Sequence, residues 1–77
     1  MSVITGLTDA KGLLVMKTIP GNAGSVAFVI DNSRRYEIAG TIAGDDTILI
    51  IPRDEITVPQ VHSCLEIIFP GLNKQIR

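Results

Sequence analysis

Two adjacent carboxylates, Asp45 and Asp46, are the chemically most unusual feature of the sequence. They lie in the run from Gly40 to Thr47, directly after Gly44. Adjacent carboxylates at a tight turn repel each other unless a cation or backbone donors offset their charge. No residue close to them in the sequence is positively charged. Their charge must therefore be offset by the backbone or by a partner from outside this run.

Three kinds of partner fit such a pair. Aspartate side chains commonly hydrogen-bond their own backbone in turns, which would make the motif purely structural. A hard cation such as Mg²⁺ or Mn²⁺ would take carboxylate oxygens, although the other acidic residues show no spacing that completes a metal shell. A guanidinium would offer a planar fork of donors that two carboxylates can accept in bidentate fashion. The residues alone leave all three open.

Four strands are expected to position this run, because apolar and β-favouring residues recur between turn signals. The predicted strands are Val3 to Thr8, Leu13 to Thr18, Tyr36 to Ala43 and Thr47 to Ile51. A turn at Asp9 to Gly12 joins the first two strands, and Gly44-Asp45-Asp46 is a tight connection between the last two. The carboxylate pair is therefore predicted at the tip of a β-hairpin.

Two helices are expected as well. Asn22 is a favourable N-cap for a helix with apolar residues at Ala23, Val26, Ala27 and Ile30. Thr57 to Gln60 has the spacing of a capping box with proline in the first turn, and Pro70-Gly71 ends that second helix. The tail from Leu72 to Arg77 shows no clear pattern. The order β-β-α-β-β-α predicts an α+β fold, a two-layer sandwich of a four-stranded antiparallel sheet with both helices on one face.

The strands at Leu13 to Met16 and Ile48 to Ile51 are apolar on both faces. Two short helices on one face leave the other face uncovered, and a chain of 77 residues has little else to cover it. A second copy of the same chain is the expected cover. The alternative is one helix on each face, which would close the monomer.

Composition narrows the function further. Seven Lys and Arg against eight Asp and Glu give a net charge of −1, which is the wrong balance for a module that binds nucleic acid through phosphates. The single cysteine, Cys64, excludes a disulfide within one chain and suggests a reducing, cytoplasmic setting. No segment has the pattern of a signal peptide or a membrane span. We therefore expect no direct contact with nucleic acid or membrane.

The run from Gly40 to Thr47, followed by the apolar Ile48 to Ile51, is similar to the Gly-Thr-Ile-Ala-Gly-Asp-Asp-Thr signature of arginine repressor C-terminal domains. The segment from Gly12 to Ala23 resembles the strand, Pro-Gly turn and helix entry of the same family. Ile30-Asp31-Asn32 matches the end of its first helix. The resemblance covers most of the chain, and two motifs in the same order at the same separation are more specific than either motif alone.

The resemblance implies a homohexamer, a dimer of trimers, that binds L-arginine as corepressor at the trimer–trimer interface. It also implies a regulator of arginine metabolism whose operator DNA is contacted by an N-terminal winged helix-turn-helix domain. We expect residues 1–77 to be the arginine-binding and hexamerisation domain alone, with the DNA-binding domain absent from this chain. No cofactor other than the arginine ligand is implied.

The ligand's cationic groups are assigned by the family motif. By this resemblance, Asp45 and Asp46 hold them, with Asp46 taking part across the subunit boundary. Asp31 contacts the α-amino group. Thr41 and Ala43 offer backbone carbonyls. These five residues would make the pocket rich in acceptors.

The ligand's α-carboxylate is assigned to Asn22, Ala23 and Gly24, at a helix N-terminus where free N–H groups and the helix dipole favour an anion. Gly24 departs from the family pattern, because many members have a glutamine there whose amide helps to fix the ligand. Asn22 or a neighbouring subunit would have to compensate for the missing side chain.

A small metal-dependent or amino-acid-processing enzyme that uses Asp45 and Asp46 is the alternative function. It receives little support from the rest of the chain. His62 has no second histidine or acid at ligand spacing, and Cys64 lies within the apolar stripe of the second predicted helix. A nucleophile would also need a base and an oxyanion site, and neither is recognisable. We therefore expect a binding module and no enzyme.

Overall fold

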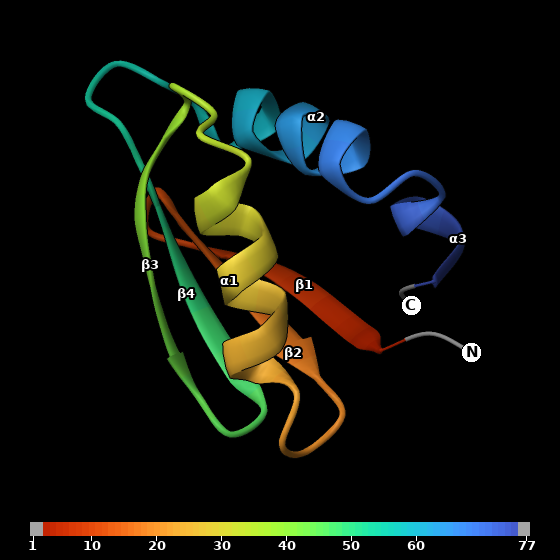
Figure 1. Cartoon of the computed structure of the whole chain (residues 1–77). Coiled ribbons are helices and arrows are strands. Elements are labelled where there is room, and N and C mark those ends of the chain that lie inside the picture. Colours follow the sequence, from red (N-terminus) through yellow and green to blue (C-terminus); the bar gives the residue numbers. More distant parts are fainter. Residues whose placement is uncertain (1–2, 76–77) are drawn as a thin grey trace.

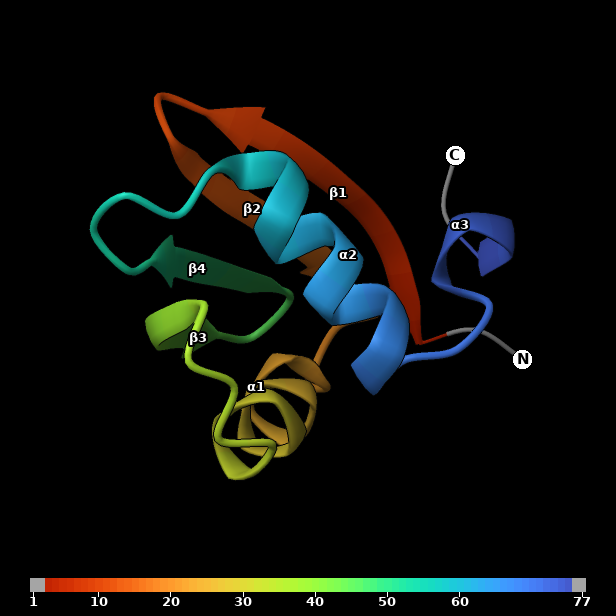
Figure 2. The same cartoon turned by 90° about the horizontal axis from the view of Figure 1, so that it is seen from above.

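The computed structural model describes residues 3–75 of the chain. Its elements are β1 (Ile4–Ala10), β2 (Leu13–Thr18), α1 (Ala23–Asn32), β3 (Ile38–Gly44), β4 (Thr47–Pro52), α2 (Val58–Ile68) and α3 (Leu72–Gln75). The strands form one antiparallel sheet in the order β1-β2-β4-β3. α1 and α2 lie on the same face of this sheet (Figures 1 and 2). The predicted two-layer α+β sandwich is therefore confirmed, and one helix on each face was the wrong alternative.

The core lies between the sheet and the two long helices. Strand alternation buries Leu14 and Met16 of β2 and Ile48 and Ile50 of β4, all at 1 % exposure or less. The helices complete this core with their apolar stripes, namely Ala23, Val26, Ala27 and Ile30 of α1 and Val61, Cys64 and Leu65 of α2. No helix among residues 3–75 is long and apolar enough to span a membrane.

Three strands differ from the prediction by one or two residues at their ends, and the tail differs as well. β1 continues to Ala10 because a two-residue turn suffices: Lys11 and Gly12 both have positive φ, 53° and 82°. β3 begins only at Ile38, since Tyr36 lies outside the sheet with the Arg53 guanidinium 4.6 Å from its ring centre. The tail forms the short helix α3, which is anchored by the fully buried Leu72.

The helix starts confirm one predicted cap and correct the other. Thr57 and Gln60 form the predicted capping box: the Thr57 N–H donates to Gln60 Oε1 at 2.7 Å, and the Gln60 N–H donates to Thr57 Oγ1 at 3.3 Å. Asn22 stands at the N-cap position of α1, but its side chain caps nothing. Its amide donates backwards to the Pro20 carbonyl at 3.2 Å.

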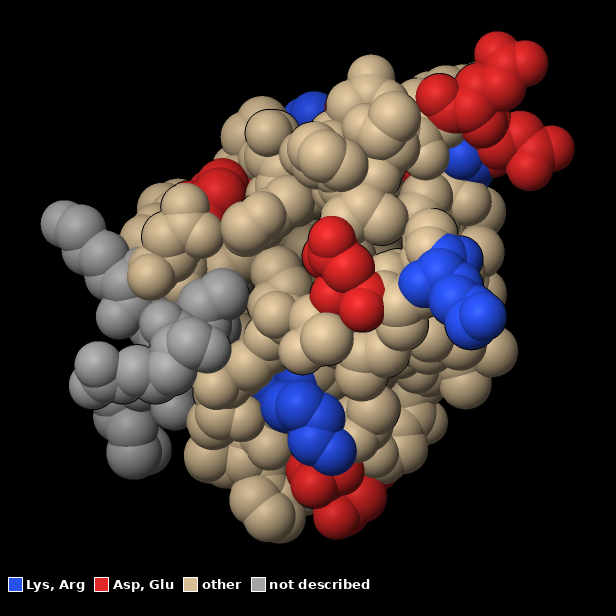
Figure 3. Space-filling model, turned by 180° about the vertical axis from the view of Figure 1, so that it is seen from behind, with Lys and Arg blue, Asp and Glu red and all other residues tan. Residues whose placement is uncertain are grey.

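The sheet face away from the helices is apolar, as predicted. One row across the strands consists of Thr8, Val15, Leu49 and Ile42. Val15 and Leu49 are only partly buried, and Ile42 is 63 % exposed. Figure 3 views the molecule from this side and shows a broad uncharged surface with separate charged side chains. This outer face, defined by the row from Thr8 to Ile42, is uncovered in the single chain.

Candidate ligand-binding site

The carboxylate pair lies at a two-residue hairpin turn between β3 and β4. Gly44 pairs with Thr47, so Asp45 and Asp46 alone form the turn. Asp45 has a φ of 50°, in the left-handed region that aspartate tolerates better than most residues. The predicted tight connection is confirmed, and it places both carboxylates at one end of the sheet.

Backbone hydrogen bonds tie this hairpin turn to the start of α1. The Asp45 carbonyl accepts from the Gly21 N–H at 3.1 Å and from the Ala23 N–H at 3.0 Å, and the Asp46 carbonyl accepts from the Thr18 N–H at 2.8 Å. The end of β2, the Pro20-Gly21 turn and the first residue of α1 are therefore fixed against the turn. Sequence-predicted residues from two distant motifs are brought together here.

The start of α1 also has backbone donors that remain free. The first N–H groups of a helix have no partner within it and carry the positive end of its dipole. Ala23 is fully buried and its N–H is used by Asp45, so it is not available to an anion. The N–H groups of Gly24 and Ser25 have no acceptor among residues 3–75. Ser25 was not identified from the sequence, because only helix register shows its N–H to be unpaired.

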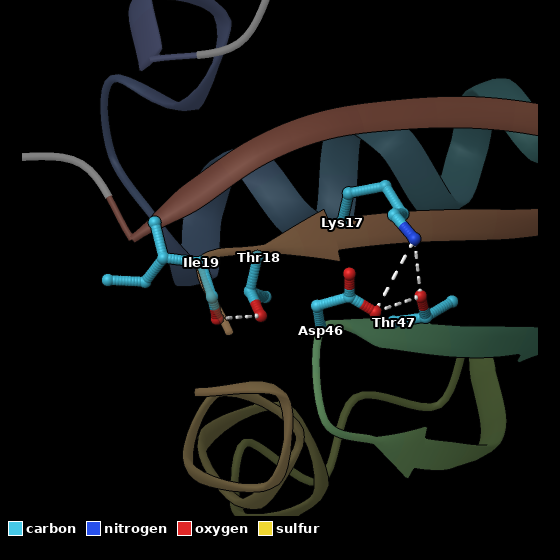
Figure 4. Close-up of polar contacts among 5 residues, drawn as sticks. All are labelled: Lys17, Thr18, Ile19, Asp46 and Thr47. Atoms are coloured by element: carbon cyan, nitrogen blue, oxygen red, sulfur yellow. Dashed lines mark hydrogen bonds and ion pairs between the residues drawn. The ribbon is translucent and has the colours of Figure 1, made fainter. Parts of the chain in front are cut away.

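Asp46 has a charged partner that the sequence did not indicate. Lys17 Nζ lies 3.5 Å from Asp46 Oδ1 and donates to Thr47 Oγ1 at 2.7 Å, and Thr47 Oγ1 donates to Asp46 Oδ1 at 2.8 Å (Figure 4). The Thr47 hydrogen bond and the Lys17 charge lower the pKa of the Asp46 carboxyl below its ordinary value. Asp46 is therefore held in its charged form.

The Asp45 side chain differs from that of Asp46. It is exposed and makes no hydrogen bond or ion pair with any residue from 3 to 75. The self-capping arrangement in which an aspartate bonds its own turn backbone is therefore not seen at Asp45. One carboxylate of the pair is partnered and the other faces solvent.

Asp31 lies at the other end of α1, where it contacts β3. Thr41 Oγ1 donates to Asp31 Oδ1 at 2.9 Å, which brings two more predicted site residues together. Ala43 follows two residues later in β3, so it lies on the same side of the strand as Thr41 and is exposed. Because β3 is at the edge of the sheet, one side of its backbone is free to meet a ligand or another chain.

The predicted residues form two separate groups in one chain. Asp31 is eight residues after Ala23, which corresponds to roughly 12 Å along the helix axis. The α-amino and α-carboxylate groups of an amino acid are bonded to the same carbon. Asp31 and the free N–H groups at the start of α1 therefore cannot contact both groups of one ligand within one chain. The described part of the chain also forms no pocket of its own.

Among the other reactive groups, Arg35 pairs locally and Cys64 lies in the core, while buried His62 Nε2 and Glu66 Oε2 have no hydrogen-bond partner among the described residues. Arg35 Nη2 lies 3.3 Å from Glu37 Oε2. Burial raises the pKa of the Cys64 thiol, which keeps it protonated and unreactive in the core. Across residues 3–75, no three His, Cys, Asp or Glu side chains lie close enough together to hold a metal ion. The hairpin turn and the start of α1 remain the chemically distinctive region.

Comparison with known proteins gives the family. The sequence model of the family described as "Arginine repressor, C-terminal domain" matches residues 1–66. The chain belongs to this family. Membership in the arginine repressor family explains why the hairpin turn and the Pro-Gly turn before α1 resemble that family's motifs.

Arginine repressors from several bacteria are similar to this chain. That of Desulfitobacterium hafniense (strain DSM 10664 / DCB-2) is 47% identical over 61 residues, which cover 79% of this chain and 40% of the relative. That of Carboxydothermus hydrogenoformans is 50% identical, over 75% of this chain and 39% of the relative. That of Bacteroides thetaiotaomicron is 43% identical, over 86% of this chain and 42% of the relative. The chain thus spans about two fifths of the length of these relatives, whose names are those of regulators and not of enzymes.

Proposed function

We propose that this arginine repressor domain is the effector-binding and oligomerisation part of a cytoplasmic transcriptional regulator of arginine metabolism. L-arginine binds as corepressor at the trimer–trimer interface of a hexamer. A winged helix-turn-helix domain outside this chain contacts operator DNA, because a net charge of −1 does not suit this domain for phosphate contacts. The observation that carries the proposal is the Asp45-Asp46 turn bonded to the start of α1.

The chemistry of this region suits an amino acid with a cationic side chain. The free Gly24 and Ser25 N–H groups at the positive end of α1 favour a carboxylate. The unpartnered Asp45 carboxylate favours a cation close by, and a planar guanidinium uses two carboxylates better than an ammonium does. Anion-binding and cation-binding groups therefore lie side by side at one end of the sheet.

Two features support a site between subunits. Asp31 can contact the α-amino group while the start of α1 contacts the α-carboxylate of the same ligand only when Asp31 and α1 come from different chains. The outer face is apolar and uncovered, and burying it against other copies would assemble such chains. Ligand and hexamer would then stabilise one another reciprocally, because the ligand cross-links the trimers.

Titration calorimetry with arginine, citrulline and lysine tests the cation contact. Citrulline has nearly the shape of arginine but a neutral ureido group, so its binding leaves the carboxylates without a charge partner. Losing one partner of a buried charge pair weakens binding by about 30- to 4,000-fold. Lysine keeps the charge but lacks the planar fork, and should also bind more weakly than arginine. Equal affinities for arginine and citrulline would remove the carboxylate pair from the mechanism.

Asp46→Asn tests the same contact from the protein side, with Asp54→Asn as the control. Both variants remove one exposed aspartate charge, but Asp54 lies in the turn after β4. Asp46→Asn should weaken both arginine binding and arginine-promoted hexamer formation, while Asp54→Asn should leave them unchanged. The alternative of a metal-dependent enzyme is tested by thermal unfolding with Mg²⁺ or Mn²⁺ in place of arginine. That alternative predicts that the metal alone raises the unfolding temperature.

A further inference from the structure

Lys17 is the one cation in contact with the proposed ligand-binding turn among the described residues, and the family motifs assign it no role in binding. It lies on the outer face in a row that also contains Gly6, Thr47 and Gly44. Its ammonium group donates to Thr47 Oγ1 at 2.7 Å and lies 3.5 Å from Asp46 Oδ1 (Figure 4). The ammonium therefore occupies one of the positions beside Asp46 that an external cation could use.

We propose that Lys17 is an internal competitor of the guanidinium, which neutralises Asp46 in the ligand-free domain and lowers its affinity for arginine. This inference rests on the proposed arginine-binding function. An incoming guanidinium must either displace the Lys17 ammonium from Asp46 or bind beside a like charge. In both cases Lys17 opposes binding, so its removal should tighten the complex.

The geometry allows Lys17 to leave without disturbing the turn. The two side chains are 48% and 42% exposed, and exposed ion pairs of this kind are weak and screened by salt. The stem of Lys17 passes over Gly6, where a Cβ atom would meet Lys17 Cβ and Cγ at 3.7 and 3.8 Å. The stem is thus placed by Gly6, whereas the ammonium end is accessible to solvent.

Asp46 stays oriented when the ammonium moves. Thr47 Oγ1, which also accepts from the Lys17 ammonium, donates to Asp46 Oδ1 at 2.8 Å, and this second contact does not require the ammonium. The Asp46 backbone carbonyl is also held by the Thr18 N–H at 2.8 Å. Contacts with β2 and β4 therefore position the Asp46 carboxylate, whereas Lys17 contributes only its charge. A role in positioning would predict the opposite sign, because removal of Lys17 would then weaken arginine binding.

The test is titration calorimetry of L-arginine with the wild-type chain and with Lys17→Met, at low and at physiological salt. Lys17→Met should bind arginine about 2- to 5-fold more tightly, the range expected for an exposed ion pair. The gain should shrink as salt rises. Lys17→Arg, which keeps the charge, should not bind more tightly than wild type.

Lys11→Met is the matched control, because it removes one exposed lysine charge in the β1–β2 turn at the other end of the sheet. It should leave arginine affinity unchanged, which excludes an effect of net charge alone. Lys17→Gln provides a second neutral variant, and thermal unfolding checks that both neutral variants are folded. Unchanged or weaker binding by both neutral variants overturns the inference while leaving arginine binding intact. A wild-type chain that does not bind arginine overturns both proposals.

Discussion

Asp45 and Asp46 are neighbours in the sequence but have different surroundings in the fold. Asp46 accepts a hydrogen bond from Thr47 and lies beside Lys17, whereas the Asp45 carboxylate has no partner within residues 3–75. If arginine binds the turn, Asp45 is available to it without rearrangement. Asp46 becomes fully available only when Lys17 moves away. The two carboxylates should therefore contribute unequally to the first contact with a ligand.

Gly24 offers a prediction about the other end of the ligand. It is exposed, and a Cβ atom there would meet no atom within 4 Å. Gly24→Ala should raise the free energy of unfolding by up to about 0.5–1 kcal/mol, because glycine loses more backbone freedom in a helix. Gly24→Gln should give a similar gain and also bind arginine more tightly, since its amide can reach a ligand at the start of α1.

Chemical denaturation and calorimetry on both Gly24 variants separate the two effects. Gly24→Ala is the control for helix stability without an added polar group. If Gly24→Gln binds arginine no more tightly than Gly24→Ala, position 24 does not face the ligand. The assignment of the α-carboxylate to the start of α1 would then be wrong.

The starts of α1 and α2 show what local sequence can and cannot predict about a helix. Asn22 and Thr57 both belong to the residues that favour an N-cap. Thr57 has an extended backbone, with a ψ of 160°, and its side chain reaches the Gln60 N–H. Asn22 has a ψ of −4°, outside the extended region typical of an N-cap, and its side chain bonds the Pro20 carbonyl and not the helix. The Asp45 carbonyl satisfies Ala23 instead, a contact from another hairpin that local sequence cannot contain.

These two caps lead to opposite expectations for the same substitution. Thr57→Ala should lower the free energy of unfolding by about 1 kcal/mol, because it leaves the Gln60 N–H without its cap. Asn22→Ala should have a clearly smaller effect, since it removes only an exposed hydrogen bond to Pro20. Urea unfolding of both variants at the same pH measures the difference. An equal loss in the two variants would show that Asn22 caps α1 in solution.

The order of the strands explains why Lys17 was not predicted. Turn residues identified both hairpins from the sequence, because each hairpin is local. The pairing of β2 with β4, which places Lys17 opposite Thr47, joins residues that are 30 positions apart. No short-range pattern specifies that pairing. The strands, the two long helices and most residues of the candidate site were therefore predictable, whereas the electrostatic partner of Asp46 was not.

At the scale of the whole molecule, the distribution of apolar surface indicates where other chains would bind. Ile42 and Ile67 are almost equally exposed, at 63 % and 62 %. Ile42 belongs to the outer face, whereas Ile67 lies on α2 in the helix layer. If the outer face is the surface that assembles, the two positions should respond differently to the same charge.

Ile42→Lys should shift the chain to smaller species, because assembly would bury a charge in an apolar interface. Ile67→Lys should leave the size distribution unchanged. Sedimentation equilibrium at micromolar concentration, with and without arginine, measures both, and circular dichroism checks that each variant is folded. The wild-type chain should be a hexamer, or a trimer when dilute and without ligand. A monodisperse wild-type monomer, or equal loss of assembly in both variants, would contradict this assignment.

The attachment of α1 to the hairpin turn is made by main-chain atoms alone, and this affects how freely the specificity of the domain can be redesigned. The carbonyls of Asp45 and Asp46 hold Gly21, Ala23 and Thr18 whatever side chains the turn carries. Position 46 can therefore be randomised without detaching the helix. Position 45 favours glycine, asparagine or aspartate, because its φ of 50° lies in the left-handed region. A library for new effectors would best vary residue 46 widely and residue 45 within these three amino acids.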